Sequence, residues 1–334
     1  MSKNVKRLFV TNDSSAAGNL RVSRRPDFLI SLTRQLVWGQ FPSDAELSGF
    51  FGKRRKHQSR PNWQGDQPQH RLEHIDAVGV GLVELCSRYD AIELWMDPRA
   101  NDQLQLICLL HYLRGYPEIA SRLSLVQAHV PIGGQSPEVL ARWNLPAVKI
   151  SEDHFELASR AWRAFGAATP RDWFGLLATD LSLLPRLRSA VAVLLEELPW
   201  HRSGLGATEM RMLDFIAGWK PTPQEIGAHE VRDSGRVFDY WEQGSLLDGL
   251  ARCRKPLVSG LKEGPFTMEL HDDRARHKRY TKSKLALTPL GHAILAQTDD
   301  FARHNPIRRW WGGTKLTNKN LWRWDADNKM LVAP

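Results

Sequence analysis

The sequence Arg7-Leu8-Phe9-Val10-Thr11-Asn12-Asp13-Ser14-Ser15-Ala16-Ala17-Gly18 decides the fold of the first part of the chain. Its apolar residues 8–10 predict a short buried strand. The small polar residues that follow predict a loop into a helix, with Ser14 or Ser15 as the residue that caps it. A strand that passes through such a loop into a helix is typical of parallel α/β sheets.

A second junction of the same form begins at residue 92. The apolar residues 92–96 predict a strand, Asp97-Pro98-Arg99 follows it, and leucines at helical spacing predict a largely buried helix over residues 101–113. Shorter apolar runs at 28–30 and 124–126 predict two more strands. Strands that alternate with helices predict a parallel, Rossmann-like α/β sheet with right-handed crossovers.

The rest of the chain predicts two further regions after a parallel α/β domain of residues 1–130. Residues 131–203 show helical patterns and predict a helical connector. In residues 204–334, Thr208 is expected to cap one helix, Thr222-Pro223 to start a second, and residues 237–251 to form a third. Strand-like runs at 257–258, 266–268 and 285–287 come next. Three helices followed by a small sheet predict a winged-helix-like domain.

Four tryptophans mark the end of the chain. They are Trp310, Trp311, Trp322 and Trp324, and Gly312-Gly313 separates the two pairs. Arginine and tryptophan side chains together can stack on a nucleic-acid base. We favour the alternative, in which the tryptophans pack the tail onto the core. Residues 321–332 predict a hairpin that turns near Asp327-Asn328.

The composition is that of a globular protein. The 334 residues include 42% hydrophobic and 25% charged residues, which excludes wholesale disorder. No run of eighteen apolar residues predicts a membrane span, and the basic N-terminus lacks the apolar stretch of a secretory signal. Cys86, Cys108 and Cys253 are far apart, and the first two lie in apolar helical patterns. We therefore expect free thiols, no membrane partner and a cytoplasmic location.

The net charge of +9 permits an anionic partner, and the basic residues fall into two clusters. One is Lys53-Arg54-Arg55-Lys56 with Arg60. The other lies in the predicted winged-helix-like domain, on or beside its wing. Its candidate nucleic-acid-binding residues are Arg274, Arg276, Lys278, Arg279 and Lys282. The third predicted helix offers few of the side chains that read a DNA groove, so a protein partner remains an alternative to nucleic acid.

The candidate ligand site lies at the two strand ends, because parallel strands present their carboxyl ends on one rim. There, the free N–H groups and positive dipole end at a helix start suit a small anionic ligand. The candidate ligand-binding residues are Thr11, Asn12, Ser14, Ser15, Arg34, Asp97 and Asp102. The alternative is that these small polar residues only form the turn, and that Asp97 caps it before Pro98. The loop lacks the Walker and G-x-G-x-x-G patterns, and no pattern identifies a cofactor.

Two sequence patterns suggest chemistry. Asp13 and Asp97 are candidate catalytic residues, since paired carboxylates can hold Mg²⁺ for chemistry on a phosphate-containing substrate. His70-Arg71-Leu72-Glu73-His74 matches an inverted zinc-protease pattern. Because five-residue patterns arise by chance and no further acidic ligand is evident, we expect no metal there.

Four motifs together resemble a known family. They are residues 11–18; residues 95–105, which end in Asp102-Gln103-Leu104-Gln105; Gly204-Leu205-Gly206-Ala207-Thr208-Glu209; and Arg309-Trp310-Trp311-Gly312-Gly313-Thr314. The chain resembles, over nearly its whole length, the bacterial family catalogued as domain of unknown function 1835. The resemblance implies an α/β N-terminal domain and a characteristic C-terminal region, and carries no activity with it.

The chain departs from that family pattern at three loops. Asp13 and Ser14 stand where the family has glycine and aspartate, Gln35 replaces an acidic residue, and Asp97-Pro98-Arg99 replaces glutamate, histidine and aspartate. This loss of acidic and histidine positions weighs against an enzyme and leaves ligand binding intact. Our leading hypothesis is a cytoplasmic ligand-binding and interaction protein, with a regulator as one candidate role, that binds a small anionic ligand at the strand ends and nucleic acid or a protein through its C-terminal domain. The alternative is a metal-assisted hydrolase or transferase.

Overall fold

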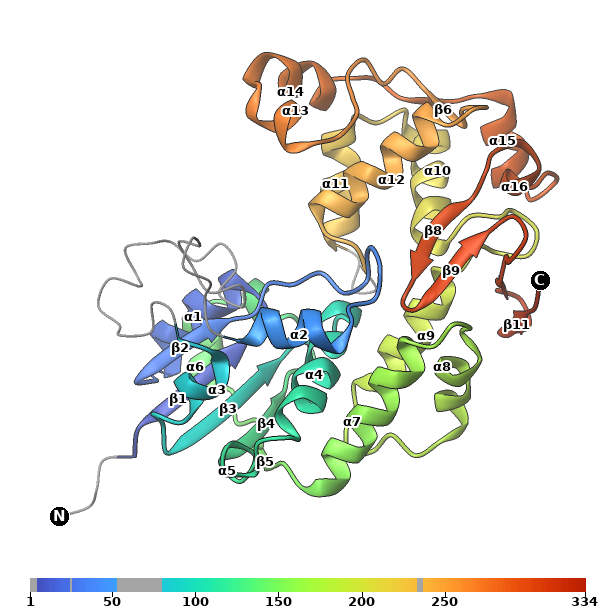
Figure 1. The fold of residues 1–334 in the computed structure, drawn as a ribbon. Helices are drawn as coiled ribbons and strands as arrows, with labels where there is room; N and C mark the ends of the chain where they lie inside the picture. The colour runs from blue at the N-terminus through green and yellow to red at the C-terminus, as the bar shows by residue number, and fades with distance from the viewer. Residues whose placement is uncertain (1–4, 25, 53–79, 233–236) are drawn as a thin grey trace. The chain divides into compact units, whose positions relative to one another are not determined.

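The computed structural model describes residues 5–24, 26–52, 80–232 and 237–334, and the side chains of residues 230–232 are left out of the description (Figure 1). The chain divides into two compact units. The N-terminal unit comprises Met1–Leu36, Phe41–Phe165 and Ala178–Ala190, and the C-terminal unit comprises Val37–Gln40, Gly166–Leu177 and Val191–Pro334. Residues 131–203, the predicted connector, contribute to both units.

The N-terminal unit is built on a five-stranded sheet. Its strands are β1 (Arg7–Thr11), β2 (Phe28–Ser31), β3 (Ala91–Met96), β4 (Leu123–Gln127) and β5 (Val148–Lys149), in the order β2-β1-β3-β4-β5. The first four strands are parallel, and β5 pairs with β4 in the antiparallel sense. The four predicted strands are thus confirmed. The two residues of β5 are both exposed, so no apolar run indicated this strand.

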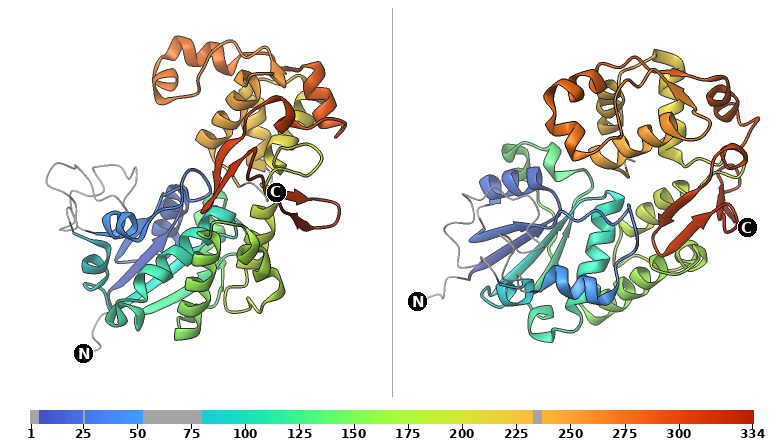
Figure 2. Two further views of the ribbon diagram at one scale, coloured as in Figure 1. Left: turned by 45° about the vertical axis from the view of Figure 1, so that its right-hand side comes forward. Right: turned by 45° about the horizontal axis from the view of Figure 1, so that its top comes forward.

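Helices cover both faces of this sheet, as the two views in Figure 2 show. Helix α1 (Ser14–Arg24) packs with α6 (Pro137–Arg142) and the 3₁₀ turn η3 (Ile132–Gly134) on one side, and α4 (Ala100–Leu113) packs with α7 (Glu152–Phe165) on the other. The remaining helices of this unit are α2 (Asp44–Phe51), α3 (Leu82–Cys86) and α5 (Pro117–Ala120). The layered Rossmann-like arrangement predicted from the sequence is therefore present.

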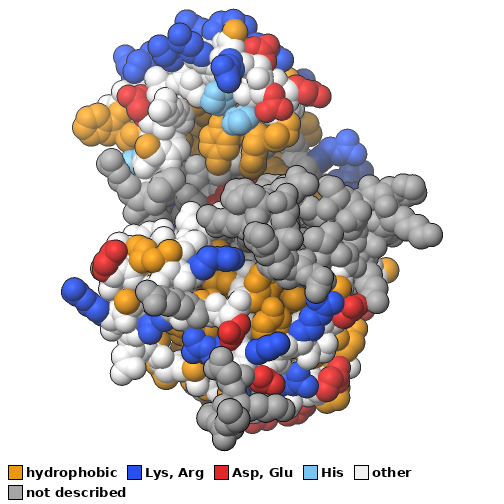
Figure 3. All heavy atoms as spheres, turned by 90° about the vertical axis from the view of Figure 1, so that its left-hand side faces the viewer, with side chains coloured by type: hydrophobic (Ala, Val, Ile, Leu, Met, Phe, Trp, Pro, Cys, Tyr) orange, Lys and Arg blue, Asp and Glu red, His pale blue; other side chains and the backbone are white. Residues whose placement is uncertain are grey.

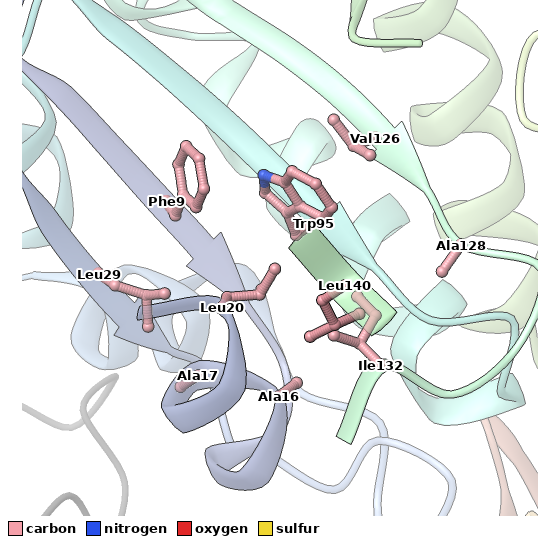
Figure 4. Packing of buried hydrophobic residues seen from close by; sticks show 10 residues of the cluster. All are labelled: Phe9, Ala16, Ala17, Leu20, Leu29, Trp95, Val126, Ala128, Ile132 and Leu140. Carbon is pink, nitrogen blue, oxygen red and sulfur yellow. The ribbon is translucent and has the colours of Figure 1, made fainter. Parts of the chain in front are cut away.

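The core under α1 draws alternate residues from the strands, because successive strand side chains point to opposite faces. Phe9, Leu29, Trp95 and Val126 pack there against Ala16, Ala17 and Leu20 of the helix (Figure 4). The intervening strand residues, such as Leu8, Ile92 and Leu94, are also fully buried. A sheet covered on both faces needs nearly continuous apolar strands, which is what residues 8–10 and 92–96 provide.

The C-terminal unit is mainly helical, with three small antiparallel strand pairs. In the described part of the chain its helices and strands, in order, are α8 (Arg171–Gly175), η4 (Leu176–Ala178), α9 (Leu187–Glu196), α10 (Ala207–Trp219), α11 (Pro223–Arg232), α12 (Tyr240–Arg252), β6 (Val258–Ser259), α13 (Met268–Asp272), α14 (Arg274–Thr281), β7 (Ala286–Leu287), α15 (Pro289–Leu295), α16 (Phe301–His304), β8 (Arg308–Trp311), β9 (Thr314–Thr317), β10 (Arg323–Asp325) and β11 (Met330–Val332). The last residue of η4 and the first turn of α9 belong to the N-terminal unit. Strand β6 pairs with β7, β8 with β9, and β10 with β11.

Several local expectations for this unit need correction. Residues 266–268 form no strand, because the Thr267 hydroxyl accepts a hydrogen bond from Leu270 N and starts α13. The basic segment is helical rather than a strand or wing loop, since it makes up most of α14. Gly206, and not Thr208, is the N-cap residue of α10. The hairpin of β8 and β9 was missed at the sequence level, whereas the β10–β11 hairpin is confirmed.

The tryptophan tail packs onto the core, as predicted. Trp311, Trp322 and Trp324 are buried, and the Trp311 indole donates to the carbonyl oxygen of Leu194 over 2.8 Å. Cys86 and Cys108 are buried free thiols whose pKa burial raises to about 12, so they behave as the small apolar residues that the sequence indicated. Within the described ranges, no helix is both long and apolar enough to cross a membrane.

Candidate functional site

The strand order of the sheet reverses between β1 and β3, so the ends of these two strands form a topological switch point. From β1 the chain continues to β2 on one side, and the next strand, β3, lies on the other side of β1. The two strands are parallel, with Val10 opposite Leu94, so Asn12 and Asp97 follow them at one edge. Ligands of open α/β sheets bind at this kind of switch point.

Asn12 is buried, and its side-chain amide is held in one orientation. Its Nδ2 donates to the carbonyl oxygen of Asp102, 3.1 Å away, and lies 3.0 Å from the Met96 sulfur. Turning the amide over would bring two oxygens together, so the assignment is firm on chemical grounds. The other end of the amide, Oδ1, is buried and accepts no hydrogen bond from the described residues.

Asp97 is the most deeply placed charged group of this edge, with only 2% of its surface exposed. Its Oδ1 accepts from the backbone N–H of Ile132 over 2.8 Å, whereas Oδ2 is buried and accepts no hydrogen bond from the part of the chain described. Burial raises the pKa of this carboxyl to about 6, and the Ile132 hydrogen bond and the Arg99 charge oppose that rise. The expectation that Asp97 caps the turn before Pro98 is wrong, because its side chain binds the loop after β4 instead.

Arg99 lies between the two carboxylates. Its Nη1 is 3.6 Å from Asp13 Oδ2, and its Nη2 is 3.9 Å from Asp97 Oδ2. Charge-assisted hydrogen bonds are about 2.7–2.9 Å long, so neither contact is a full one. The guanidinium is therefore loosely held, and a ligand can redirect it at small cost.

Asp13 caps α1, which corrects the expectation that Ser14 or Ser15 does so. Its Oδ1 accepts from Ala16 N over 2.8 Å. Gly133 of η3 lies against this cap: a Cβ added there would be 2.7 Å from Asp13 Oδ1 and 3.2 Å from Ala16 N. Ser14 and Ser15 are exposed. The start of α1 is thus partly covered by Gly133, and it is exposed on the side of the two serines.

The remaining predicted ligand residues have other surroundings. Thr11 is buried within β1, and Asp102 is buried in the first turn of α4, where its carbonyl holds Asn12. The Arg34 guanidinium lies over the ring of Phe50 on α2, 5.0 Å from its centre. The structure therefore brings together Asn12, Asp13, Asp97 and Arg99.

Sequence reasoning missed two supports of this edge, one from the 3₁₀ turn η3 and one from helix α4. One is the Ile132 amide, and the other is Gln103, whose Nε2 donates to the carbonyl of Asp97 over 2.6 Å. The first had a signal, since Ile132-Gly133-Gly134 follows β4 and the carboxyl ends of parallel strands share an edge.

Metal ligands do not gather in the described part of the chain, where no group of three histidine, cysteine or acidic residues could hold an ion. The cluster of residues 53–56 with Arg60 and the histidine pattern of residues 70–74 lie outside the described residues.

The five candidate nucleic-acid-binding residues lie on α14, apart from Lys282, which follows it as the C-cap residue. Glu263 binds two of them: Arg276 Nε is 3.2 Å from its carboxylate, and Arg279 Nε is 2.7 Å from it. Arg274, Lys278 and Lys282 are exposed. These residues therefore form a basic helix with part of its charge neutralised.

Two of the motifs that carry the family resemblance meet in a buried network. Glu197 accepts from the Thr208 hydroxyl over 2.6 Å and from Thr208 N over 3.2 Å, and Arg309 Nη1 is 2.8 Å from Glu209 Oε2. Burial raises the pKa of Glu197 to about 7. Only glycine fits at position 206, because a Cβ would lie 2.7 Å from the Glu197 carbonyl oxygen. These motifs thus have a structural role.

No protein-family model matches the chain, and a search of curated proteins finds no similar sequence. The resemblance inferred from the four motifs stays a prediction.

Proposed function

We propose that the protein binds a small polar ligand at the ends of β1 and β3, through hydrogen-bond donors and an anionic group that the ligand carries. The observation that supports this is that two buried acceptors of this edge, Asn12 Oδ1 and Asp97 Oδ2, accept no hydrogen bond from the described chain, and that Asp97 Oδ2 has only the long ion pair with Arg99. A buried acceptor left without a hydrogen bond costs about 1–3 kcal/mol, so proteins rarely keep two of them at one edge without a use.

The charges around these acceptors specify the rest of the ligand. An N–H or O–H group of the ligand would satisfy Asn12 and Asp97. Its anionic group would take Arg99 from the two carboxylates and approach the exposed hydroxyls of Ser14 and Ser15 at the start of α1. A nucleoside monophosphate and a phosphorylated sugar both combine these features.

Native mass spectrometry of the gently purified chain tests the proposal. We expect a mass excess that disappears on denaturation, and adenosine monophosphate serves as a probe for calorimetry if the sites are empty after purification. Asp97→Asn keeps the acceptor for Ile132 N but turns a donor toward the ligand, so binding should be lost. Asp273→Asn, at the exposed cap of α14, is the matched control. Absence of any bound species, or equal binding by Asp97→Asn, would contradict the proposal.

A second function, metal-assisted hydrolysis or transfer on a phosphate-containing substrate, has one observation in its favour. Asp97 Oδ2 and Asn12 Oδ1 are oxygen atoms of the kind that Mg²⁺ prefers, and one or two carboxylates suffice for that ion. Arg99 would have to move away for an ion to enter. Turnover of a nucleotide panel with Mg²⁺, lost in Asp97→Ala, would favour this alternative over simple binding.

The C-terminal unit is the part of the proposal that concerns a macromolecular partner. Helices α10, α11 and α12, followed by β6 and β7, occur in the order of a winged helix, with α13 and α14 inserted between the two strands. We assign nucleic-acid binding to Arg274, Lys278 and Lys282, with Arg276 and Arg279 held partly by Glu263. In a mobility-shift assay, the logarithm of the binding constant should fall linearly with the logarithm of the salt concentration.

A triple substitution tests whether these exposed basic residues bind DNA themselves or only add to the net positive charge. Replacing Arg274, Lys278 and Lys282 with alanine should weaken binding to duplex DNA by at least about ten-fold. Replacing the exposed Arg254, Arg303 and Lys319 removes the same charge elsewhere and should have a smaller effect. Equal losses would mean that only net charge matters, and binding that ignores salt would contradict a nucleic-acid partner.

A further inference from the structure

The C-terminal unit contains an apolar pocket that neither the strand-end site nor the basic surface uses. It lies between α11, α12 and α14 and has a volume of about 560 Å³. Pockets that bury small organic ligands are about 300–1,000 Å³ in volume and mostly apolar. The buried residues Ile226 and Leu247 line it, together with the rings of Phe266 and Tyr280.

Aromatic rings form one wall of this pocket. Phe266 is the centre of the group, with its ring 5.3 Å from that of Tyr240 and 5.1 Å from that of Tyr280. Gly244 on α12 makes room for Phe266, because a Cβ at that position would overlap the phenyl ring. Offset and edge-on contacts at these separations are favourable for aromatic pairs, so the wall would receive a further planar ring in the same way.

The mouth of the pocket is polar at one point. There the Tyr240 hydroxyl and His277 Nε2 are hydrogen-bonded over 3.0 Å, and both residues are at least partly exposed. Among the described residues, neither aspartate nor glutamate lines the pocket, and α14 next to it carries a cluster of arginine and lysine. Figure 3 shows basic side chains above histidine and hydrophobic side chains in the upper part of one face, with acidic side chains beside them. This charge pattern favours an acidic group on the ligand and disfavours an ammonium group.

We infer that this pocket binds a small aromatic carboxylic acid, with its ring against Phe266 and its carboxylate at the Tyr240–His277 pair. The ring of the ligand supplies a planar apolar surface that fits the aromatic wall of the pocket. Its carboxylate accepts a hydrogen bond from the Tyr240–His277 pair at the mouth. The site is separate from the strand ends, so it stands whether or not Asp97 binds a ligand. A ligand here contacts α14 through His277 and would thereby connect the pocket to the basic surface.

Calorimetric titration of the full chain with 2-naphthoate tests the inference. Gly227 is the position to change, because it lines the pocket and a Cβ there meets no atom within 4 Å. Gly227→Phe fills the pocket and should weaken 2-naphthoate binding by at least about ten-fold. Gly249→Phe is the matched control: Gly249 lies on α12, its added Cβ also meets open space, and it does not line the pocket. Its affinity should stay within about two-fold of the wild type.

Two further titrations test the chemistry of the ligand. The amine of the same ring, 2-naphthylmethylamine, should bind at least about ten-fold more weakly than the acid, and Tyr240→Phe should weaken the acid by a few-fold through loss of one hydroxyl. Saturable 1:1 binding with this pattern supports the site. No binding of 2-naphthoate, equal binding by Gly227→Phe, or equal binding of the amine would overturn the inference. Both glycine variants lie in helices, where phenylalanine is a better helix former than glycine, so folding is retained.

Discussion

Two buried carboxyl groups, Asp97 in the N-terminal unit and Glu197 in the C-terminal unit, resemble each other in burial and differ in their partners. Burial raises the pKa of both, to about 6 and about 7. Both oxygens of Glu197 accept hydrogen bonds from Thr208, whereas Asp97 has one accepted bond and one oxygen without a donor in the described chain. Burial and a raised pKa are therefore shared, and only the hydrogen bonds separate the two.

The difference distinguishes a structural group from a candidate binding group. Glu197 completes a network that fixes the start of α10, and a ligand would find nothing to bind there. Asp97 fixes the loop after β4 with one oxygen, and the other accepts no hydrogen bond from the described chain and has only the long contact with Arg99. A raised pKa alone is thus a poor guide to function, since structural networks perturb pKa values too.

The largest expected effect comes from breaking the satisfied network. Glu197→Ala should lower the free energy of unfolding of the C-terminal unit by about 4 kcal/mol, because it leaves the buried Thr208 groups unpaired and opens a void. Hydrogen exchange of the α10 amides at pH 6 measures this unit separately. Glu197→Gln keeps one acceptor and should lose about half as much. Unchanged exchange in Glu197→Ala would mean that the network contributes no stability.

Asp97→Asn should raise the free energy of unfolding, whereas Glu197→Ala lowers it. The pKa of the Asp97 carboxyl rises from 3.8 to about 6 on folding, so the native state binds the proton more tightly than the unfolded state. The wild type therefore loses stability as the pH rises from about 3.8 to about 6, and its free energy of unfolding stays at the lower value above pH 6. The asparagine variant lacks this loss and should gain up to about 3 kcal/mol relative to wild type. Urea unfolding from pH 4.5 to pH 8 tests this. A constant difference between the two proteins would show that Asp97 is not buried as a charge.

The cap of α1 provides the third comparison. Asp13→Ala should cost about 1 kcal/mol, because the Ala16 amide loses its acceptor. Ser14→Ala, one residue later and exposed, should change stability by less than about 0.5 kcal/mol. Hydrogen exchange of the first α1 amides measures the effect of both substitutions on the stability of this helix end. If the serine variant is the more damaging one, the cap is wrongly assigned.

The smallest effect is expected at Arg99. Its contacts to Asp13 and Asp97 are long and its side chain is 24% exposed, so Arg99→Gln should cost less than about 1 kcal/mol after allowance for solvent screening. Arg309→Gln breaks the shorter pair with Glu209 and should cost about 2 kcal/mol. Urea unfolding at pH 8 compares the two. Equal losses would remove the argument that Arg99 is loosely held and ready for a ligand.

Much of the N-terminal unit could be predicted, because its signals are local. Residues 8–10 and 92–96 are apolar runs long enough for buried strands, and the rule for parallel sheets then puts Asn12 and Asp97 on one edge. Local rules also misled: Ser14 and Ser15 are good caps by type, but Asp13 reaches the Ala16 amide first. The basic residues 274–282 carry no apolar period, so their helix was not evident.

The sequence alone determined the four parallel strands of the N-terminal sheet and which of their loops share the rim, because apolar runs and their spacing along the chain dictate these features. Only the tertiary structure decided which hydrogen-bond partner each polar atom at that rim has. Whether Asp97 caps its own turn or binds Ile132 depends on where the loop after β4 passes, and that path is fixed by the packing of η3 on α1. The same holds for Glu197 and Thr208, and for the pocket that Gly244 opens beside Phe266. Contacts between distant segments set these hydrogen bonds and cavities, and no local pattern encodes them.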